Sequence, residues 1–443
     1  GRLPVHQLAD YAGTVNRPVL LRSWSNALAQ VGYSDNWADY DLCEAIYAHF
    51  RNDVGPVGPI VVINSLDPDT QRLAAQTESV TLANGQGSIK RDDMILKTIA
   101  IEGKVLGTDF TAEYAADGAS VLIKDLTGKI VSPVTVTFDA VDPSLVTETE
   151  IISSLEALSL VYQTMNMVPT ILDAPAWSHM PEVASALKAS ALQINGHWYA
   201  FVNTNIDATT AKTIAEAVAW KATNGYTGAG EAPCWPMAKK GDRIFHLSTL
   251  TTVAMQQIDH DNGDLPYETP SNKPISITGL CLADGTDIEF DQVTANQLNE
   301  QGIRTATFWG GRWILWGPHT GAYVYGKDLE PRDIFDSSRR MFYQLMNDFQ
   351  LRYGILVDKP LSRAQVDTIL NDYQEYLDNM ISRGALLHAL IAFIETSNPI
   401  SDIVEGDFVF DVATTTTPPA KSITGVVRYT SKGLQALFGG EQA

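Results

Sequence analysis

The chain has 443 residues, and its content of 45% hydrophobic and 19% charged residues is typical of a globular protein with two or three domains. The formal net charge of −21 argues against a general nucleic-acid-binding protein, because contacts to phosphates need a basic face. Three widely spaced cysteines, Cys43, Cys234 and Cys281, predict neither a disulfide framework nor a zinc site and indicate synthesis in a reducing cytoplasm. The longest apolar run, at 385–394, is too short to span a membrane and no signal peptide is visible, so no direct membrane insertion is expected.

Residues 1–67 alternate between strand and helix patterns. A short apolar strand is predicted at 18–21, and the continuous apolar run at 60–63 is typical of a strand that is covered on both faces. Two helices are predicted between these strands. The candidate caps are Ser23 or Ser25 for the first helix and Asp39 or Asp41 for the second.

Residues 68–146 differ in character from their surroundings and predict a small inserted β-rich domain. Short alternating segments at 79–82, 121–123 and 134–138 are typical of strands, and Asn84-Gly85 is a turn signal between them.

The strand and helix rhythm resumes at 147–273. Strands are predicted at 168–172, 198–202 and 244–247, separated by helices of 10–15 residues. This alternation predicts a doubly wound, mainly parallel sheet, which together with 1–67 makes one α/β domain built from two segments.

Residues 274–443 predict an α+β C-terminal domain. One long helix is expected from Pro331 to about Tyr353, and the next helix begins at a Ser362 cap. Strands are predicted at 308–313 and 314–317, where the aromatic-glycine pattern occurs, and at 387–395, 408–410 and 425–430, with 414–419 as a solvated connector.

No catalytic, cofactor-binding or metal site is predicted. The glycine run 225–230 follows a helix, whereas a phosphate loop follows a strand. The acidic stretch 259–264 lacks the glycine and glutamate positions of an EF-hand and is interpreted as a surface turn. Ser178 and His179 are the best catalytic candidates, at a predicted strand end, but no partner acid can be singled out.

Two regions are candidates for contacts with other chains. Arg339 and Arg340 form a basic pair on a predicted helix, which fits a binding patch and an ordinary solvated face equally well. The segment 421–443 has a net charge of +2 in an otherwise acidic chain and contains a strand-forming run that needs a partner strand. Trp309, Trp313 and Trp316 are interpreted as core anchors. Val426, Val427, Arg428, Tyr429 and Thr430 are predicted to pair either with the sheet of another chain or within a sheet of their own chain.

The order of several short motifs resembles the contractile tail sheath proteins of phages over nearly the whole chain. These motifs are 26–32, 57–64 with Leu66-Asp67-Pro68, Trp309-Gly310-Gly311-Arg312, Trp316-Gly317, Ser338-Arg339-Arg340 and the final predicted strand.

The resemblance implies a subtilisin-like α/β sheath domain without protease activity, a sheath C-terminal domain and smaller inserted domains. It implies subunits that stack as rings around an inner tube, exchange terminal strands, and contract to drive the tube through the target envelope. The implied partners are copies of the chain itself, the inner tail tube protein, and baseplate and tail terminator proteins. With these partners, Val426 to Thr430 are the expected strand-exchange residues, and the expected contacts to the tube or a neighbour are Arg428, Lys432, Arg339 and Arg340. The implied location is the virion tail of a phage or prophage particle, assembled in the bacterial cytoplasm.

Two departures from the family pattern bear on this reading. An N-terminal arm would precede Gly1, so polymerisation is expected to need residues ahead of it. Pro318 and His319 follow Gly317 where the family commonly has an arginine. The competing hypotheses are an α/β hydrolase with an appended binding domain, and another tail or baseplate structural subunit.

Overall fold

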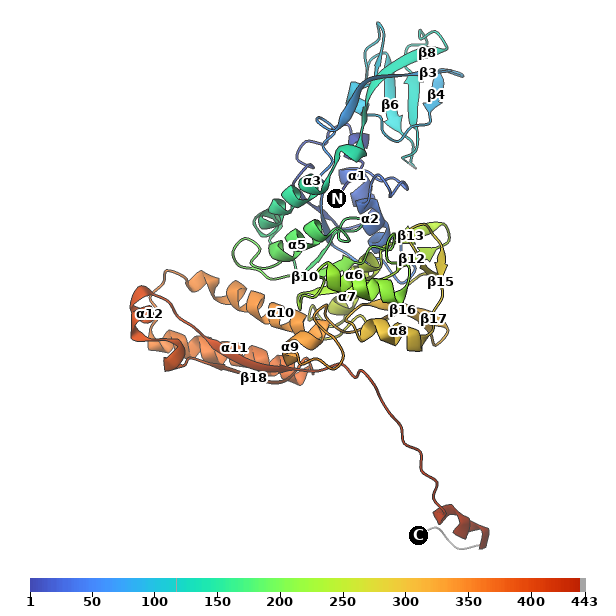
Figure 1. The fold of residues 1–443 in the computed structure, drawn as a ribbon. Coiled ribbons are helices and arrows are strands. Elements are labelled where there is room, and N and C mark those ends of the chain that lie inside the picture. The colour runs from blue at the N-terminus through green and yellow to red at the C-terminus, as the bar shows by residue number, and fades with distance from the viewer. Residues whose placement is uncertain (117, 439–443) are drawn as a thin grey trace.

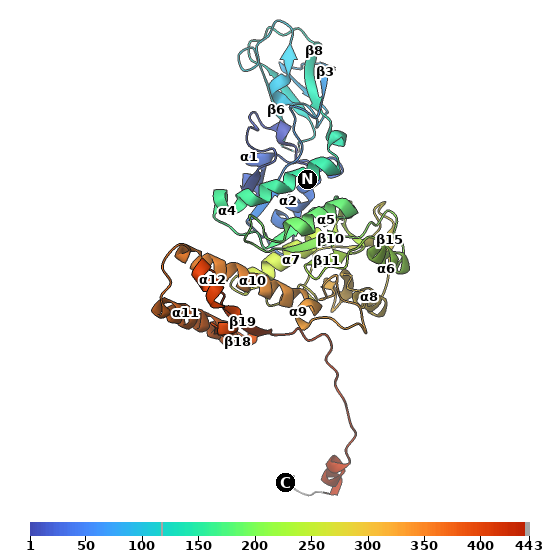
Figure 2. The ribbon, with the colours of Figure 1, turned by 60° about the vertical axis from the view of Figure 1, so that its left-hand side comes forward.

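The computed structural model describes residues 1–116 and 118–438 and has a mixed α/β fold with several small sheets. Figure 1 shows a β-rich part at one end, a mixed α/β part in the middle and an elongated helical part at the other end. The last residues leave the elongated part as a long extension, and the rotated view in Figure 2 shows the same arrangement.

The N-terminal elements follow the sequence prediction closely. They are β1 (Pro18–Leu21), α1 (Trp24–Val31), α2 (Leu42–Phe50) and β2 (Ile60–Ile63), and β1 pairs with β2 in antiparallel fashion. The Ser23 side chain accepts a hydrogen bond from the Asn26 amide and so caps α1 as predicted. Asp41 precedes α2 but does not cap it with its side chain, because its carboxylate binds the Arg2 guanidinium at 2.7 Å and the Trp177 indole at 2.9 Å.

The β-rich part consists of two three-stranded antiparallel sheets. Phe110, Val121, Ile123 and Val136 are completely buried between them, which gives this part its own apolar core. The strands are β3 (Arg72–Val80), β4 (Gln86–Ile89), β5 (Ala100–Ile101), β6 (Phe110–Tyr114), β7 (Val121–Asp125) and β8 (Val134–Val141).

A three-stranded parallel sheet, ordered β11-β10-β9, lies in the middle part. Phe201 and Val202 of β10 point to opposite faces, toward Met255 of α7 and toward a core cluster that contains Leu187 of α5. Helices therefore cover both faces of β10. The elements are α3 (Glu148–Ser154), α4 (Leu160–Met165), β9 (Ile171–Asp173), α5 (Pro181–Ser190), β10 (Phe201–Asn205), α6 (Ile214–Thr223), β11 (Glu231–Cys234) and α7 (Leu247–Asp261).

Several predicted boundaries in this part are displaced. The strands predicted at 168–172 and 198–202 begin about three residues later, at Ile171 and Phe201. The strand predicted at 244–247 ends at Phe245, because the following residues start the unpredicted helix α7. A doubly wound, mainly parallel sheet is predicted for this region. The described residues form instead a three-stranded parallel sheet and a separate four-stranded antiparallel sheet. The four-stranded sheet consists of β13 (Arg243–Phe245), β12 (Met237–Lys240), β14 (Gly279–Cys281) and β15 (Asp287–Ile288).

The aromatic-glycine motif forms a β-hairpin after α8 (Gln292–Asn299). β16 (Thr305–Trp309) pairs with β17 (Arg312–Trp316), and Gly310 and Gly311 form the turn with positive φ angles. Ala306, Ile314 and Leu315 are buried in the hairpin.

The elongated part packs two long helices and a two-stranded antiparallel sheet around a shared core. The helix predicted from Pro331 is divided at Phe335, whose extended backbone separates two helices. The strand predicted at 408–410 lies at Asp411–Thr416 instead, so threonines expected in a solvated connector pair with β18. The elements are α9 (Pro331–Ile334), α10 (Asp336–Tyr353), α11 (Arg363–Ser382), β18 (Leu386–Ala392), α12 (Ile400–Glu405) and β19 (Asp411–Thr416).

Candidate assembly interface

The segment after β19, which we call the arm, extends away from the rest of the chain (Figure 1). Residues 417–431 form no helix or strand, and a short 3-10 helix, η7 (Lys432–Phe438), follows them. The root of the arm is held where the Thr417 hydroxyl donates to the Gly384 carbonyl at 2.7 Å and the Lys421 ammonium donates to the Tyr323 hydroxyl at 3.1 Å. Beyond Lys421, Val427 is 98% exposed.

The predicted strand 426–430 has no partner strand within the described residues. Its apolar side chains Val426, Val427 and Tyr429 are exposed, although their residue types favour a pleated and half-buried setting. Unpaired amide and carbonyl groups beside exposed apolar side chains make this segment available to the sheet of another chain.

The sheet of β18 and β19 offers a complementary surface. It has only these two strands in the described residues. The Gln374 side chain of α11 already bonds the Ala389 carbonyl at 3.2 Å and the Ile391 amide at 3.1 Å on the outer edge of β18, so the outer edge of β19 is the open one. Residues 385–420, which contain this sheet, include five acidic residues and no lysine or arginine, whereas 421–432 contain three basic residues and no acidic one. This charge difference favours contact between the arm of one copy and the sheet of another. The acidic residues are Glu395, Asp402, Glu405, Asp407 and Asp411, and the basic ones are Lys421, Arg428 and Lys432.

The two arginines of α10 make contacts inside the chain. Arg340 is 3% exposed and is ion-paired with Asp259 of α7, a carboxyl whose pKa is raised by burial. This corrects the expectation that Arg340 faces a tube or a neighbour. Arg339 is half-buried, with its guanidinium 2.9 Å from the Asp333 carboxylate and 4.8 Å from the centre of the Tyr343 ring.

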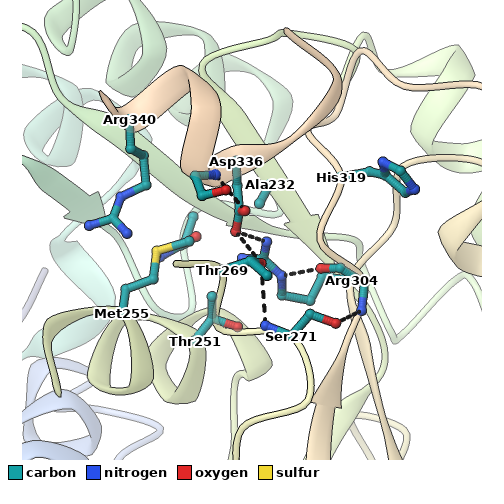
Figure 3. A network of polar contacts seen from close by, with 12 residues as sticks. Ala232, Thr251, Met255, Thr269, Ser271, Arg304, His319, Asp336 and Arg340 are labelled. Carbon is teal, nitrogen blue, oxygen red and sulfur yellow. Dashed lines mark hydrogen bonds and ion pairs between the residues drawn. The ribbon is translucent and has the colours of Figure 1, made fainter. Parts of the chain in front are cut away.

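A buried polar network that the sequence analysis missed joins the hairpin to α10 (Figure 3). Arg304 and Asp336 form an ion pair with no exposed side-chain surface. The Arg304 Nε donates to the Gly317 carbonyl at 2.9 Å, and the Thr269 hydroxyl donates to the Asp336 carboxylate at 3.2 Å. Burial raises the pKa of Asp336, while the charge of Arg304 opposes that shift. The network fixes the position of α10, on which β19 rests through the 2.9 Å bond between the Thr416 and Ser338 hydroxyls.

Among the tryptophans of the hairpin, Trp309 departs from the predicted role of core anchor, whereas Trp313 agrees with it. Trp309 is 57% exposed at the hairpin tip and is not a core anchor. Trp313 is partly buried against a core cluster that contains Phe245, and the Trp316 indole donates to the Asn296 amide oxygen at 2.8 Å. The tip lies outside the core because the turn at Gly310 and Gly311 extends beyond the buried residues Ala306, Ile314 and Leu315.

The residues considered for hydrolysis lie in a closed polar cluster at the ends of β9 and β10. Ser178 is completely buried, and its hydroxyl accepts a 3.0 Å hydrogen bond from the Asn205 amide. The same amide donates to the Ser248 hydroxyl at 2.7 Å, and Ser248 donates to the Asp173 carboxylate at 2.8 Å. Burial raises the pKa of Asp173 to about 7 and lowers that of His179. These contacts join β9, β10 and α7 to one another.

The side chains of residues 1–116 and 118–438 also bear on metal and membrane binding. No group of three or more histidine, cysteine, aspartate or glutamate side chains in this part of the chain is arranged to hold a metal ion. None of its helices combines the length and apolar character required to cross a bilayer.

No family model matches the chain, but individual relatives and solved structures are similar to it. The chain is 27% identical to the tail sheath protein of Burkholderia phage BcepMu, over 97% of this chain and 92% of that protein. It is 22% identical to the major tail sheath protein of Serratia phage KSP20, over 64% of this chain and 69% of that protein. Its fold is similar to the crystal structure of a sheath tail protein from Listeria innocua, with a TM-score of 0.51, 11% identity and coverage of 93% of this chain and 94% of that one. The chain is therefore a homologue of phage tail sheath proteins.

Proposed function

We propose that the chain is a structural subunit of a contractile tail sheath, which polymerises around an inner tube and contracts to drive that tube through a target envelope. The relationship to phage tail sheath proteins over nearly the whole chain supports this function. The single observation that carries the assembly mechanism is the unpaired arm, which presents a strand-forming sequence away from the rest of the molecule (Figure 1).

Copies are linked by strand exchange. Residues Val426 to Thr430 of one subunit add a strand to the sheet of β18 and β19 in a neighbour, where main-chain hydrogen bonds supply affinity. The open edge of β19 and the opposite charges of the two segments support this pairing. A flexible link of this kind allows subunits to change their packing during contraction without separating.

The basic groups of the arm, Arg428 and Lys432, face the acidic sheet of a neighbour or an acidic inner tube. The half-buried Arg339 remains a weaker candidate for such a contact. The chain then acts in the virion tail with copies of itself, the tube protein and baseplate proteins, and it has no catalytic role.

The domain organisation follows the same proposal. Residues 1–67 and 147–273 form the α/β sheath domain, 68–146 form an inserted β-rich domain that projects outward, and 274–443 form the C-terminal sheath domain with its arm. The separate apolar core of the β-rich part supports the second boundary pair.

Proline substitutions within the arm test strand exchange. Val426→Pro together with Val427→Pro removes the amide donors of two consecutive residues of the exchanged strand, one of which must face the acceptor strand. Proline is not accommodated where the ladder needs its amide. We expect the full-length gene product carrying both changes to fold but to form no sheaths in negative-stain electron microscopy. The matched control is Ser422→Pro, in the arm but outside the strand, which should assemble normally. Normal sheaths from the double variant would contradict strand exchange.

A further inference from the structure

The short helix α12 presents an apolar surface that nothing covers in the described chain. Ile400 and Val404 are 80% and 79% exposed, and their i, i+4 spacing places them on one side of the helix. We propose that α12 is the docking site for the terminal segment η7 of a neighbouring copy, namely the copy whose arm pairs with this sheet. The inference rests on the proposed strand exchange and adds a second contact to it.

The loop that carries α12 is held firmly. Asn398 is 3% exposed, and its side-chain amide donates to the carbonyls of Ile394 and Val409, both at 2.9 Å. Its amide oxygen accepts from the Val409 amide at 2.8 Å. Because these bonds close both ends of the loop, the apolar side chains of α12 are held outward on a fixed support, which lowers the ordering cost of binding.

The terminal segment has the matching chemistry. Leu434 and Leu437 are 49% and 78% exposed, and residues three apart lie on the same side of a 3-10 helix. Lys432 begins the segment, whereas α12 contains Asp402 and Glu405. Apolar contact at the centre with opposite charges at the edge is the usual arrangement of a specific protein interface.

Docking at α12 also determines the direction of the exchanged strand. α12 lies between the end of β18 and the start of β19, so an arm that reaches it runs antiparallel to β19. Residues 425–430 equal the six residues of β19 in number, so the strand extends along the sheet and ends near α12. The opposite direction would bring η7 to the other end of the sheet, near Leu387 of β18.

The position of the two surfaces favours a contact between copies. In Figure 1, α12 and the root of the arm lie at opposite ends of the elongated part. A donor and an acceptor on different surfaces of one subunit join copies head to tail, and such heterologous contacts produce open polymers.

Disulfide trapping between two differently tagged chains tests the docking and its direction. One chain carries Leu437→Cys and the other Val404→Cys, and both are full-length gene products assembled together into sheaths. The native Cys43, Cys234 and Cys281 are buried and should not interfere. We expect a cross-linked heterodimer under mild oxidation. The matched control pairs Leu437→Cys with Leu387→Cys, whose position is 60% exposed at the opposite end of β18, and should give none.

The outcomes separate this inference from the proposed function. Cross-linking at Leu387 instead of Val404, or at neither position in well-formed sheaths, would overturn the docking of η7 on α12 and leave strand exchange intact. If strand exchange itself is wrong, the Val426→Pro and Val427→Pro variant should assemble normally. Cross-links confined to a single chain would also overturn the inference.

Discussion

Arg304 and Asp336 form a completely buried ion pair that joins the β16 and β17 hairpin to the first residue of α10. The same helix supports β19 through Ser338, so this pair positions the sheet that we propose as the acceptor of a neighbour's arm. Internal charge pairing therefore determines where the assembly surface lies.

The first prediction concerns this pair. Asp336→Asn leaves the Arg304 guanidinium buried without a counter-ion, and breaking a buried pair in this way costs about 3–5 kcal/mol. We expect a decrease of that size in the free energy of unfolding, measured by urea denaturation. Replacing both residues together, Arg304→Met with Asp336→Leu, should recover most of the loss, because no unpaired charge remains. Equal destabilisation by the single and double variants would contradict this interpretation.

The second prediction concerns the pH dependence of the α/β part. The pKa of buried Asp173 is raised from 3.8 to about 7, so the folded chain binds this proton more tightly than the unfolded chain. Its stabilising contribution is complete below the unfolded pKa of 3.8 and is lost as the pH rises to about 7. The asparagine in Asp173→Asn is uncharged at every pH, so this variant should not lose stability as the pH rises. The free energy of unfolding at pH 8 should then increase by up to about 4 kcal/mol, since one pKa unit corresponds to about 1.4 kcal/mol.

Urea denaturation at pH 4 and pH 8 measures this difference. The control is Asp242→Asn, which removes an exposed carboxylate near β13 and should leave the pH dependence unchanged. If the Asp173→Asn chain keeps the wild-type dependence of the free energy of unfolding on pH, Asp173 does not cause that dependence.

The third prediction tests the roles assigned to the hairpin side chains. Trp309→Ala should change the free energy of unfolding by less than about 0.5 kcal/mol, because the indole is exposed. Ile314→Ala on the paired strand should cost about 2–5 kcal/mol, because it leaves a cavity in the core. Thermal denaturation of both variants checks this difference, and a large loss for Trp309→Ala would restore the interpretation of that tryptophan as a core anchor.

The fourth prediction concerns Gly302, between α8 and β16. Its φ is +63°, and a Cβ added there would lie 2.4 Å from the Thr320 carbonyl oxygen and 2.7 Å from that of Tyr323. Gly302→Ala therefore combines backbone strain of about 1–3 kcal/mol with a clash against rigid backbone. We expect a lower melting temperature and a displaced Tyr323, which holds the arm root through Lys421. Gly310→Ala, at a similar φ in open space, isolates the strain alone and should cost less.

Elements that depend mainly on residues close to one another in the sequence were predicted correctly. The apolar strands β1 and β2 and the Ser23 and Ser362 caps appear in the structure. The two aromatic strands also appear, but the turn between them lies at Gly310 and Gly311 and not after Trp313 as predicted. Helix α7 was missed because its buried residues include Ser248, Thr249 and Thr251, so no purely apolar stripe marks it. Strand β11, with the sequence Glu-Ala-Pro-Cys, pairs with β10 through tertiary context and has no strand pattern of its own.

Only part of the candidate interface could be predicted from the sequence. The unusual charge and strand propensity of the arm are visible in the sequence, whereas the burial of Arg340 depends on Asp259, 81 residues away. The exposed apolar surface of α12 was also not predictable, because its sequence resembles that of any short amphipathic turn.

Electron microscopy of particles from the full-length gene product, with and without residues 425–443, is the decisive measurement of assembly through the arm. We expect sheath tubes from the complete gene product. We expect none from the deletion, which should remain a folded monomer with an unchanged melting temperature because the described side chains Val426, Val427, Tyr429 and Leu437 are exposed. Well-formed tubes from the deletion would contradict assembly through the arm.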